Sequence, residues 1–345
     1  MTIALDAMGG DQAPEMVFEG AEVALERHPD LCFLFVGDEA RLADLLRRHE
    51  NLAAESEIRP SESVVTGTDK PATALRQGRR SSMRIAIDAV RDGDANGVVS
   101  AGNTGALMAM AKTVLRSLPG IHRPAIGSLF PTMKGETVML DLGANIDCSA
   151  ENLFEFAVMG DVFARNVLGI VEPSVGLLNV GIESYKGNEI VRAAADLLRT
   201  QQLSIKFHGF VEGDDITAGT VDVVVCDGFT GNVALKTAEG TARLYSEFLK
   251  ATFSESVLSR LGYLLARPAL SALRERADPR RYNGGIFLGL NGIAVKSHGA
   301  SDALAFANAI GFAYDMATHG FNDAVIDELN RWYAGQNDEA KAATR

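Results

Sequence analysis

Lysine and amide side chains follow glycine-rich turns along this chain, and such groups can hold anions. Lys186 stands in NVGIESYKGN (179–188), between an apolar run and a helical pattern, and Asn232 closes DGFTGN. An ammonium group and an amide can both donate to a phosphate or a carbonyl oxygen. The alternatives are a solvated lysine and a helix-capping asparagine. We therefore treat Lys186 and Asn232 as candidate catalytic residues and keep a structural role as the alternative for each.

The stretch SAGNTGA (100–106) is the best candidate for binding phosphate. A helix is predicted to begin near Asn103 or Thr104, and Gly102 and Gly105 allow the backbone to approach a ligand. Unpaired N–H groups at a helix N-terminus attract anions, although an ordinary helix cap explains the pattern equally well. The motif is neither a Walker A loop nor a dinucleotide fingerprint. The predicted phosphate- and substrate-binding residues are Ser100, Gly102, Asn103, Thr104, Gly105, Asp227, Gly228, Gly231, Lys296, Ser297 and His298.

Two further stretches contribute polar groups around these loops. In GLNGIAVKSHG (289–299), His298 could act as a general base, although a structural role is the commoner one. There is no GxSxG motif for a serine triad, and the histidines lack the spacing of metal ligands, so no metal and no cofactor are predicted. The aspartates at strand ends could gather around Mg²⁺, but such residues more often fix loops. The predicted supporting residues are Asp6, Gly9, Gly10, Asp11, Asp141 and Asn145.

The elements that must position these residues are short apolar runs alternating with helical patterns. Helices are predicted over 14–28, 151–169 and 232–250, and strands over 2–6, 31–37, 96–100, 136–143, 174–181, 221–228 and 292–297. The apolar runs do not alternate with polar residues, which is typical of parallel strands covered on both faces. We therefore predict a three-layer α/β/α, Rossmann-like fold with a mainly parallel sheet. Ligands bind beyond the carboxyl ends of such strands, so five glycine-rich loops are expected to converge on one edge.

Length and composition limit the class of protein. The 345 residues, 47% of them hydrophobic, suit one catalytic domain over 1–334 with a protruding helical region at about 245–281. The polar stretch 335–345 is predicted to fray or to form a short helix. No leader and no membrane-spanning run are visible, and three scattered cysteines fit a reducing cytosol. A net charge of −12 argues against nucleic-acid binding.

The region 250–281 differs from the rest of the chain. Its leucines form one helical stripe, and its basic residues outnumber its acidic ones in an otherwise acidic protein. This pattern is typical of a helix that meets a membrane or an acidic partner, whereas packing on the core or a dimer interface is the more common alternative. The candidate docking residues are Leu258, Arg260, Leu261, Leu264, Leu265 and Arg267.

Taken together and in order, these motifs resemble one family. DAMGGD, SSM, VSAGNTGALMA, LDLGAN, NVGIESYKGN, DVVVCDGFTGNVALK and GLNGIAVKSHG resemble the bacterial acyl-(acyl carrier protein):phosphate acyltransferases from Ile3 to about Tyr333. The resemblance implies a homodimer whose fold is related to phosphate acetyltransferases and isopropylmalate dehydrogenases. It implies transfer of a fatty acyl group from acyl carrier protein to inorganic phosphate, with Lys186 and Asn232 needed for transfer. It also implies a cytoplasmic enzyme, peripheral on the membrane, whose acyl phosphate feeds a membrane glycerol-3-phosphate acyltransferase.

The residues suit that chemistry. Phosphate is itself a nucleophile, and a thiol with a pKa of about 8.5 leaves without much acid assistance. The protein must then orient the reactants and stabilise the developing charge, for which backbone N–H groups, a lysine and an amide are suitable. A short-chain phosphate acyltransferase using coenzyme A, a dehydrogenase on the same fold and a non-catalytic membrane scaffold are the alternatives.

Overall fold

The computed structural model describes residues 1–200, 205–276 and 284–343, and it is built on one eleven-stranded sheet. The strand order is β3-β2-β1-β4-β11-β10-β5-β6-β9-β7-β8. The strands are β1 (Thr2–Asp6), β2 (Cys32–Gly37), β3 (Ser56–Pro60), β4 (Gly97–Ser100), β5 (Ala125–Thr132), β6 (Gly135–Leu140), β7 (Ser174–Leu178), β8 (Lys206–Val211), β9 (Val223–Val225), β10 (Gly284–Leu288) and β11 (Ile293–Ser297). All seven predicted strands are present, and β3, β5, β8 and β10 are additional.

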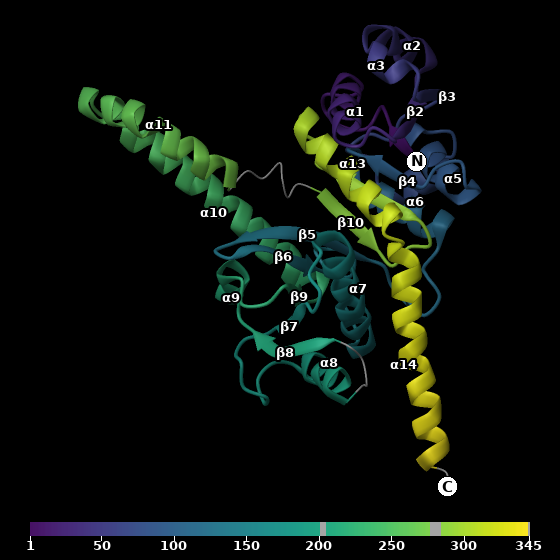
Figure 1. Cartoon of the computed structure of the whole chain (residues 1–345), viewed down its shortest axis with the longest axis vertical. Coiled ribbons are helices and arrows are strands. Elements are labelled where there is room, and N and C mark those ends of the chain that lie inside the picture. Colours follow the sequence, from purple (N-terminus) through teal and green to yellow (C-terminus); the bar gives the residue numbers. More distant parts are fainter. Residues whose placement is uncertain (201–204, 277–283, 344–345) are drawn as a thin grey trace.

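Helices cover both faces of this sheet, which gives the predicted three layers (Figure 1). They are α1 (Glu15–Arg27), α2 (Glu39–Arg48), α3 (Glu50–Ala53), α4 (Pro71–Gln77), α5 (Ser82–Asp92), α6 (Thr104–Leu115), α7 (Ala150–Leu168), α8 (Glu189–Thr200), α9 (Gly213–Ala218), α10 (Gly228–Ser254), α11 (Val257–Arg276), α13 (Ala303–Thr318) and α14 (Phe321–Ala343). Neighbouring residues of β1 face opposite layers, as strand geometry requires. Ile3 packs in the core with α1, α13 and α7, whereas Ala4 packs in the core with α5 and α6.

The direction of the strands reverses across the middle of the sheet. Strands β1, β4 and β11 run parallel to one another, and β6, β9, β7 and β8 do the same. Between the two sets, three antiparallel pairings (β11–β10, β10–β5 and β5–β6) turn the direction round. The pairing register aligns six residues in one row: Val99, Val295, Ile286, Gly127, Leu140 and Val225. The polar loops of the two sets leave this row on opposite sides.

Helices α10 and α11 pack on each other as a hairpin that projects from the body (Figure 1). The leucines of the predicted docking stripe are all exposed, and Leu258 is 79% exposed. The stripe therefore does not pack on the core. None of the described helices combines the length and apolar character needed to cross a bilayer. At the other end of the chain, α14 includes residues 335–343 of the predicted polar tail.

Candidate active site

Three loops leave the adjacent parallel strands β6, β9 and β7 and form what we call the second loop group. Asp141, directly after β6, anchors it. Its Oδ1 accepts from the backbone N–H groups of Ile126 (2.9 Å) and Ala144 (3.0 Å), and its Oδ2 accepts from Asn145 N (2.7 Å) and Nδ2 (2.9 Å). Burial raises the pKa of Asp141, and these hydrogen bonds oppose the rise. Asp141 and Asn145 thus fix the loop after β6, and their role in supporting an active site remains a prediction.

Helix α10 begins four residues earlier than predicted, at Gly228. The Asp227 carboxylate caps it, accepting from Thr230 N and Oγ1 (both 2.8 Å). The Gly228 N–H donates to Asn145 O at 2.8 Å, and a Cβ at Gly231 would lie 1.9 Å from Asp141 O. Through these contacts the start of α10 packs closely against the loop after β6. Asp227 is therefore the cap, and Asn232 lies exposed in the second turn.

The loop that carries Lys186 is held by a residue not singled out from the sequence. Asn179 Nδ2 donates to the carbonyls of Gly181 (3.1 Å) and Lys186 (3.2 Å). Gly187 has φ +87°, and a Cβ there would lie 2.2 Å from Asn179 Oδ1. This turn needs glycine, and it leaves the half-buried Lys186 beside its neighbour Tyr185, with Nζ 5.8 Å from the ring centre. An asparagine directly after a strand was the available sequence signal.

The loops after β1, β4 and β11 form the first loop group. Ser100 Oγ donates to the buried Asp6 Oδ2 at 2.7 Å and accepts from Gly102 N at 3.0 Å. A Cβ at Gly9 would lie 2.5 Å from that same Asp6 oxygen, so Gly9 covers the carboxylate. Asp11 N donates to Gly299 O at 2.8 Å and ties the β1 loop to the β11 loop. These contacts of Asp6, Gly9 and Asp11 hold the loops of the first group together, and the supporting role of these residues and of Gly10 remains a prediction.

Asn103 caps α6 and also clamps a neighbouring loop. Its Oδ1 accepts from Ala106 N at 3.0 Å, and its Nδ2 lies 3.0–3.3 Å from the carbonyls of Thr66, Gly67 and Asp69. The Asn103 amide is thus engaged by the protein. The backbone N–H groups of Thr104 and Gly105 lie in the first turn of α6, where helix geometry leaves them without an intrahelical acceptor, so they are the donors that SAGNTGA can offer to an anion.

Lys296 is the buried cation of the first loop group. Its Nζ donates to Ala101 O (3.4 Å) and to Ser297 O. Burial lowers the pKa of Lys296 to about 8, and the charges of Asp6 and Asp11 oppose that shift. An ammonium with this pKa is protonated at neutral pH and sensitive to mild alkali. A buried cation with a shifted pKa beside a glycine-rich loop is a candidate for binding an anion.

Two predicted residues beside Lys296 have other roles. The Ser297 hydroxyl is buried against Ser301 Oγ at 2.8 Å. His298 is exposed, and its Nδ1 accepts from Ala300 N at 3.1 Å. In the neutral ring the proton then lies on Nε2, which can donate but not accept. This arrangement does not present His298 as a general base.

The five loops do not meet at one edge, in contrast to the sequence expectation. The reversal of strand direction between β11 and β6 places them in two groups on opposite sides of the shared row. Within each group the hydrogen bonds are dense. The structure thus offers one group with Lys186 and Asn232, and another with Lys296 and the α6 N-terminus.

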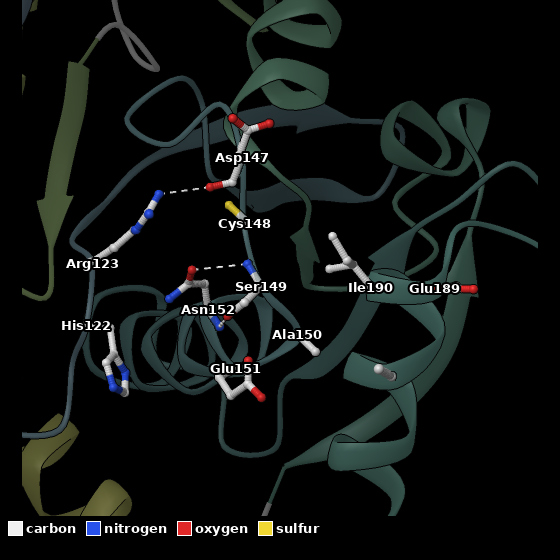
Figure 2. Close-up of a pocket in the computed structure, with 11 residues that line it drawn as sticks. His122, Arg123, Asp147, Cys148, Ser149, Ala150, Glu151, Asn152, Glu189 and Ile190 are labelled. Atoms are coloured by element: carbon white, nitrogen blue, oxygen red, sulfur yellow. Dashed lines mark hydrogen bonds between the residues drawn. The ribbon is translucent and has the colours of Figure 1, made fainter.

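A pocket of about 760 Å³ adjoins the second loop group (Figure 2). Its lining residues come from the segment before β5, from the start of α7 and from the start of α8: His122, Arg123, Asp147, Cys148, Ser149, Ala150, Glu151, Asn152, Glu189, Ile190 and Ala193. Sequence reasoning missed this pocket, since its walls are far apart in the chain. None of the predicted site residues lines it.

Comparison with known proteins identifies the fold and then the family. The fold is that of a phosphotransacetylase from Streptococcus pyogenes (TM-score 0.62, 18% identity, 92% of this chain and 94% of that one). It is also similar to 4-hydroxythreonine-4-phosphate dehydrogenase from Klebsiella pneumoniae (TM-score 0.53, 16% identity, 92% and 98% covered). These likenesses support the predicted relation to phosphate acetyltransferases in fold.

Sequence relatives are much closer. The model of the "Fatty acid synthesis protein" family matches residues 1–324. Phosphate acyltransferases from Rhodospirillum centenum and Paramagnetospirillum magneticum are 64% and 60% identical, each covering 96% of this chain and 94% of the relative. The chain belongs to this family, and it is a phosphate acyltransferase, as the motif resemblance implied.

Proposed function

We propose that this enzyme transfers a fatty acyl group from acyl carrier protein to inorganic phosphate, giving acyl phosphate for phospholipid synthesis. A phosphate oxygen attacks the thioester carbonyl, a C–O bond forms, the C–S bond breaks and the carrier leaves as a thiolate. The observation that carries the proposal is the second loop group, in which adjacent strands β9 and β7 present Asn232 and Lys186. These donors suit the charge that develops on the carbonyl oxygen.

The first loop group is assigned to phosphate. The α6 N-terminus supplies backbone N–H groups and the positive end of a helix dipole, and the buried Lys296 supplies a charge. Ser100, Asn103, Asp227 and Ser297 hold the loops through internal hydrogen bonds rather than touching substrate.

The exposed surface of α11 indicates which partners the enzyme binds. The exposed leucines of α11 and its basic residues Arg260 and Arg267 suit an anionic membrane or the acidic carrier protein. We propose a cytoplasmic homodimer, peripheral on the inner face of the membrane, that supplies a membrane glycerol-3-phosphate acyltransferase.

One experiment tests the activity directly. The purified protein is incubated with acyl-carrier protein and phosphate, and the release of free carrier thiol is measured. Release that depends on phosphate supports the proposal. Faster turnover of acyl-coenzyme A would favour the short-chain alternative, and no release from either donor would favour a scaffold.

A further inference from the structure

The pocket between α7 and α8 adjoins the proposed catalytic pair from two sides. On one wall, Asp147 and Cys148 directly follow the β6 loop, whose Asn145 contacts the start of α10. On the other wall, Glu189 and Ile190 lie three and four residues after Lys186. Strands β6, β9 and β7 are neighbours in the sheet, so the loops around this pocket are also neighbours. A ligand that reacts at Lys186 and Asn232 can extend into it.

The rim around that reaction centre is apolar and exposed. Ile146 is 69% exposed, Ile182 66% and Phe229 63%, and each comes from a different loop of the second group. The Gly228 N–H donates to Asn145 O, so the two loops that carry Phe229 and Ile146 are in contact. Exposed apolar side chains clustered at a site commonly mark a surface that an apolar ligand covers.

The pocket itself presents aliphatic and small side chains. Ile190, Ala193 and Ala150 line it, and Cys148 adds a neutral thiol. Burial raises the pKa of Cys148 to about 11, which keeps this thiol uncharged near neutral pH. These groups form a wall with which methylene groups can pack without losing hydrogen bonds.

Several polar groups of the lining are already hydrogen-bonded within the protein. Arg123 donates to Asp147 O at 2.9 Å, and Ser149 and Asn152 cap α7 reciprocally (Figure 2). The His122 backbone N–H donates to the buried Glu155 at 3.0 Å, and the ring pairs with the same carboxylate. A hydrocarbon lying along the aliphatic wall leaves these hydrogen bonds intact, and the charged side chains of Arg123, Asp147, Glu151 and Glu189 are exposed and can stay in water.

From these observations we infer that the pocket between α7 and α8 binds the hydrocarbon chain of the acyl donor, and that its depth sets the chain length the enzyme prefers. The inference rests on the proposed acyl-thioester reaction. The apolar rim of Ile146, Ile182 and Phe229 guides the chain from the reacting carbonyl, and Ile190, Ala150 and Ala193 receive its far end. A volume of about 760 Å³ lies within the range of roughly 300–1,000 Å³ typical of small-molecule pockets.

Ala193→Phe tests this assignment by filling the pocket from an exposed helix position, where folding should not suffer. Ala40→Phe, at an exposed position of α2 in the other half, is the matched control. kcat/KM is measured for acyl thioesters of the carrier protein from butyryl to stearoyl. Each methylene removed from water favours binding by up to about fourfold. We expect Ala193→Phe to reduce kcat/KM for the longest chains at least about tenfold, to leave butyryl transfer unchanged and to move the optimum to shorter chains.

An equal effect on all chain lengths, or none, would overturn the assignment, as would the same change in Ala40→Phe. A second measurement does not depend on catalysis. Fluorescence of cis-parinaric acid should rise on binding to the wild type and the Ala40→Phe control but rise less with Ala193→Phe. If the wild type binds this chain yet transfers no acyl group, the proposed reaction fails while the chain site stands. If neither variant differs from the wild type in binding, the chain site itself is wrong.

Discussion

The side-chain amide of Asn179 donates to the carbonyl oxygen of Lys186 at 3.2 Å, and so one residue fixes the turn that presents the candidate catalytic lysine. The same amide reaches Gly181 O, which closes the loop at both ends. The position of Lys186 therefore depends on a residue that need not touch substrate. Two predictions separate what these residues contribute.

Lys186→Met should lower kcat strongly while the fold is kept, because the half-buried Lys186 forms no ion pair with any residue that the structure describes, which leaves its charge for the substrate. Loss of one preorganised donor to a developing oxyanion lowers the rate by roughly one hundred- to one thousand-fold. The measurement is acyl phosphate formation at saturating donor and phosphate. Lys206→Met, at the exposed start of β8, is the matched control. Normal turnover by Lys186→Met would remove Lys186 from the site.

Asn179→Ala should lower kcat by about tenfold, because the loop around Lys186 loses both of its side-chain hydrogen bonds and a small displacement of a catalytic group is costly. Asn179→Asp should fail in the same way, since a carboxylate cannot donate to two carbonyls. Both variants should leave thermal unfolding nearly unchanged. Full activity in Asn179→Asp would show that the amide does not position Lys186.

Gly231→Ala should destabilise the protein, since its Cβ would lie 1.9 Å from Asp141 O and 2.9 Å from Cys226 Sγ. Forced overpacking of this kind reduces the free energy of unfolding by about 1–3 kcal/mol. Gly240→Ala lies in the same helix with open space around it and should raise stability by about 0.5–1 kcal/mol. Thermal or urea unfolding of the two variants gives the comparison. Equal stability would mean that the start of α10 can move away from the β6 loop.

The sequence predicted those parts of the fold and site that depend on local signals. Buried strands such as β1 and β6 have the apolar runs expected of them, and Asp141, directly after β6, accepts hydrogen bonds from the backbone of its own loop, as aspartates at strand ends commonly do. Edge strand β3 is polar and half exposed, and β5 contains Gly127 and Pro131, so neither had the pattern of a buried strand.

The arrangement of the loops could not be predicted for a related reason. With β5 and β10 unrecognised, the three antiparallel pairings that reverse the sheet could not be counted, and all five loops were placed on one edge. The contacts of Asn103 with the carbonyl of Thr66 and its neighbours join segments more than thirty residues apart. No local pattern reports such a contact. For the same reason the α7–α8 pocket became visible only in the structure.

Phosphate binding should weaken as pH rises through about 8, where Lys296 loses its proton. The signature is a rise in KM for phosphate above that pH, measured at constant ionic strength, and Lys296→Arg should abolish the rise because an arginine stays charged.

The same pKa shift makes the stability of the fold depend on pH. The pKa is lowered in the folded state from 10.5, so the unfolded chain binds more protons between about pH 8 and 10.5. Charged Lys296 thus reduces stability below pH 8, and this penalty disappears as pH approaches 10.5. A pH-independent KM for phosphate would place the anion away from Lys296.

The exposed stripe on α11 should mediate binding to lipid. Leu261 and Leu264 are 53% and 61% exposed on a hairpin that extends away from the body, and Arg260 and Arg267 can approach anionic headgroups. Apolar side chains entering the membrane interface and basic residues near an anionic surface both favour binding.

The wild type should sediment with vesicles containing anionic lipid. The double variant Leu261→Glu, Leu264→Glu should remain in the supernatant while keeping activity toward acyl-carrier protein. Val171→Glu, also at a highly exposed apolar position but outside the hairpin, should sediment like the wild type. If the double variant still binds vesicles but changes its oligomeric state, the stripe joins two copies of the chain; if it loses activity with the carrier instead, the stripe docks the donor protein.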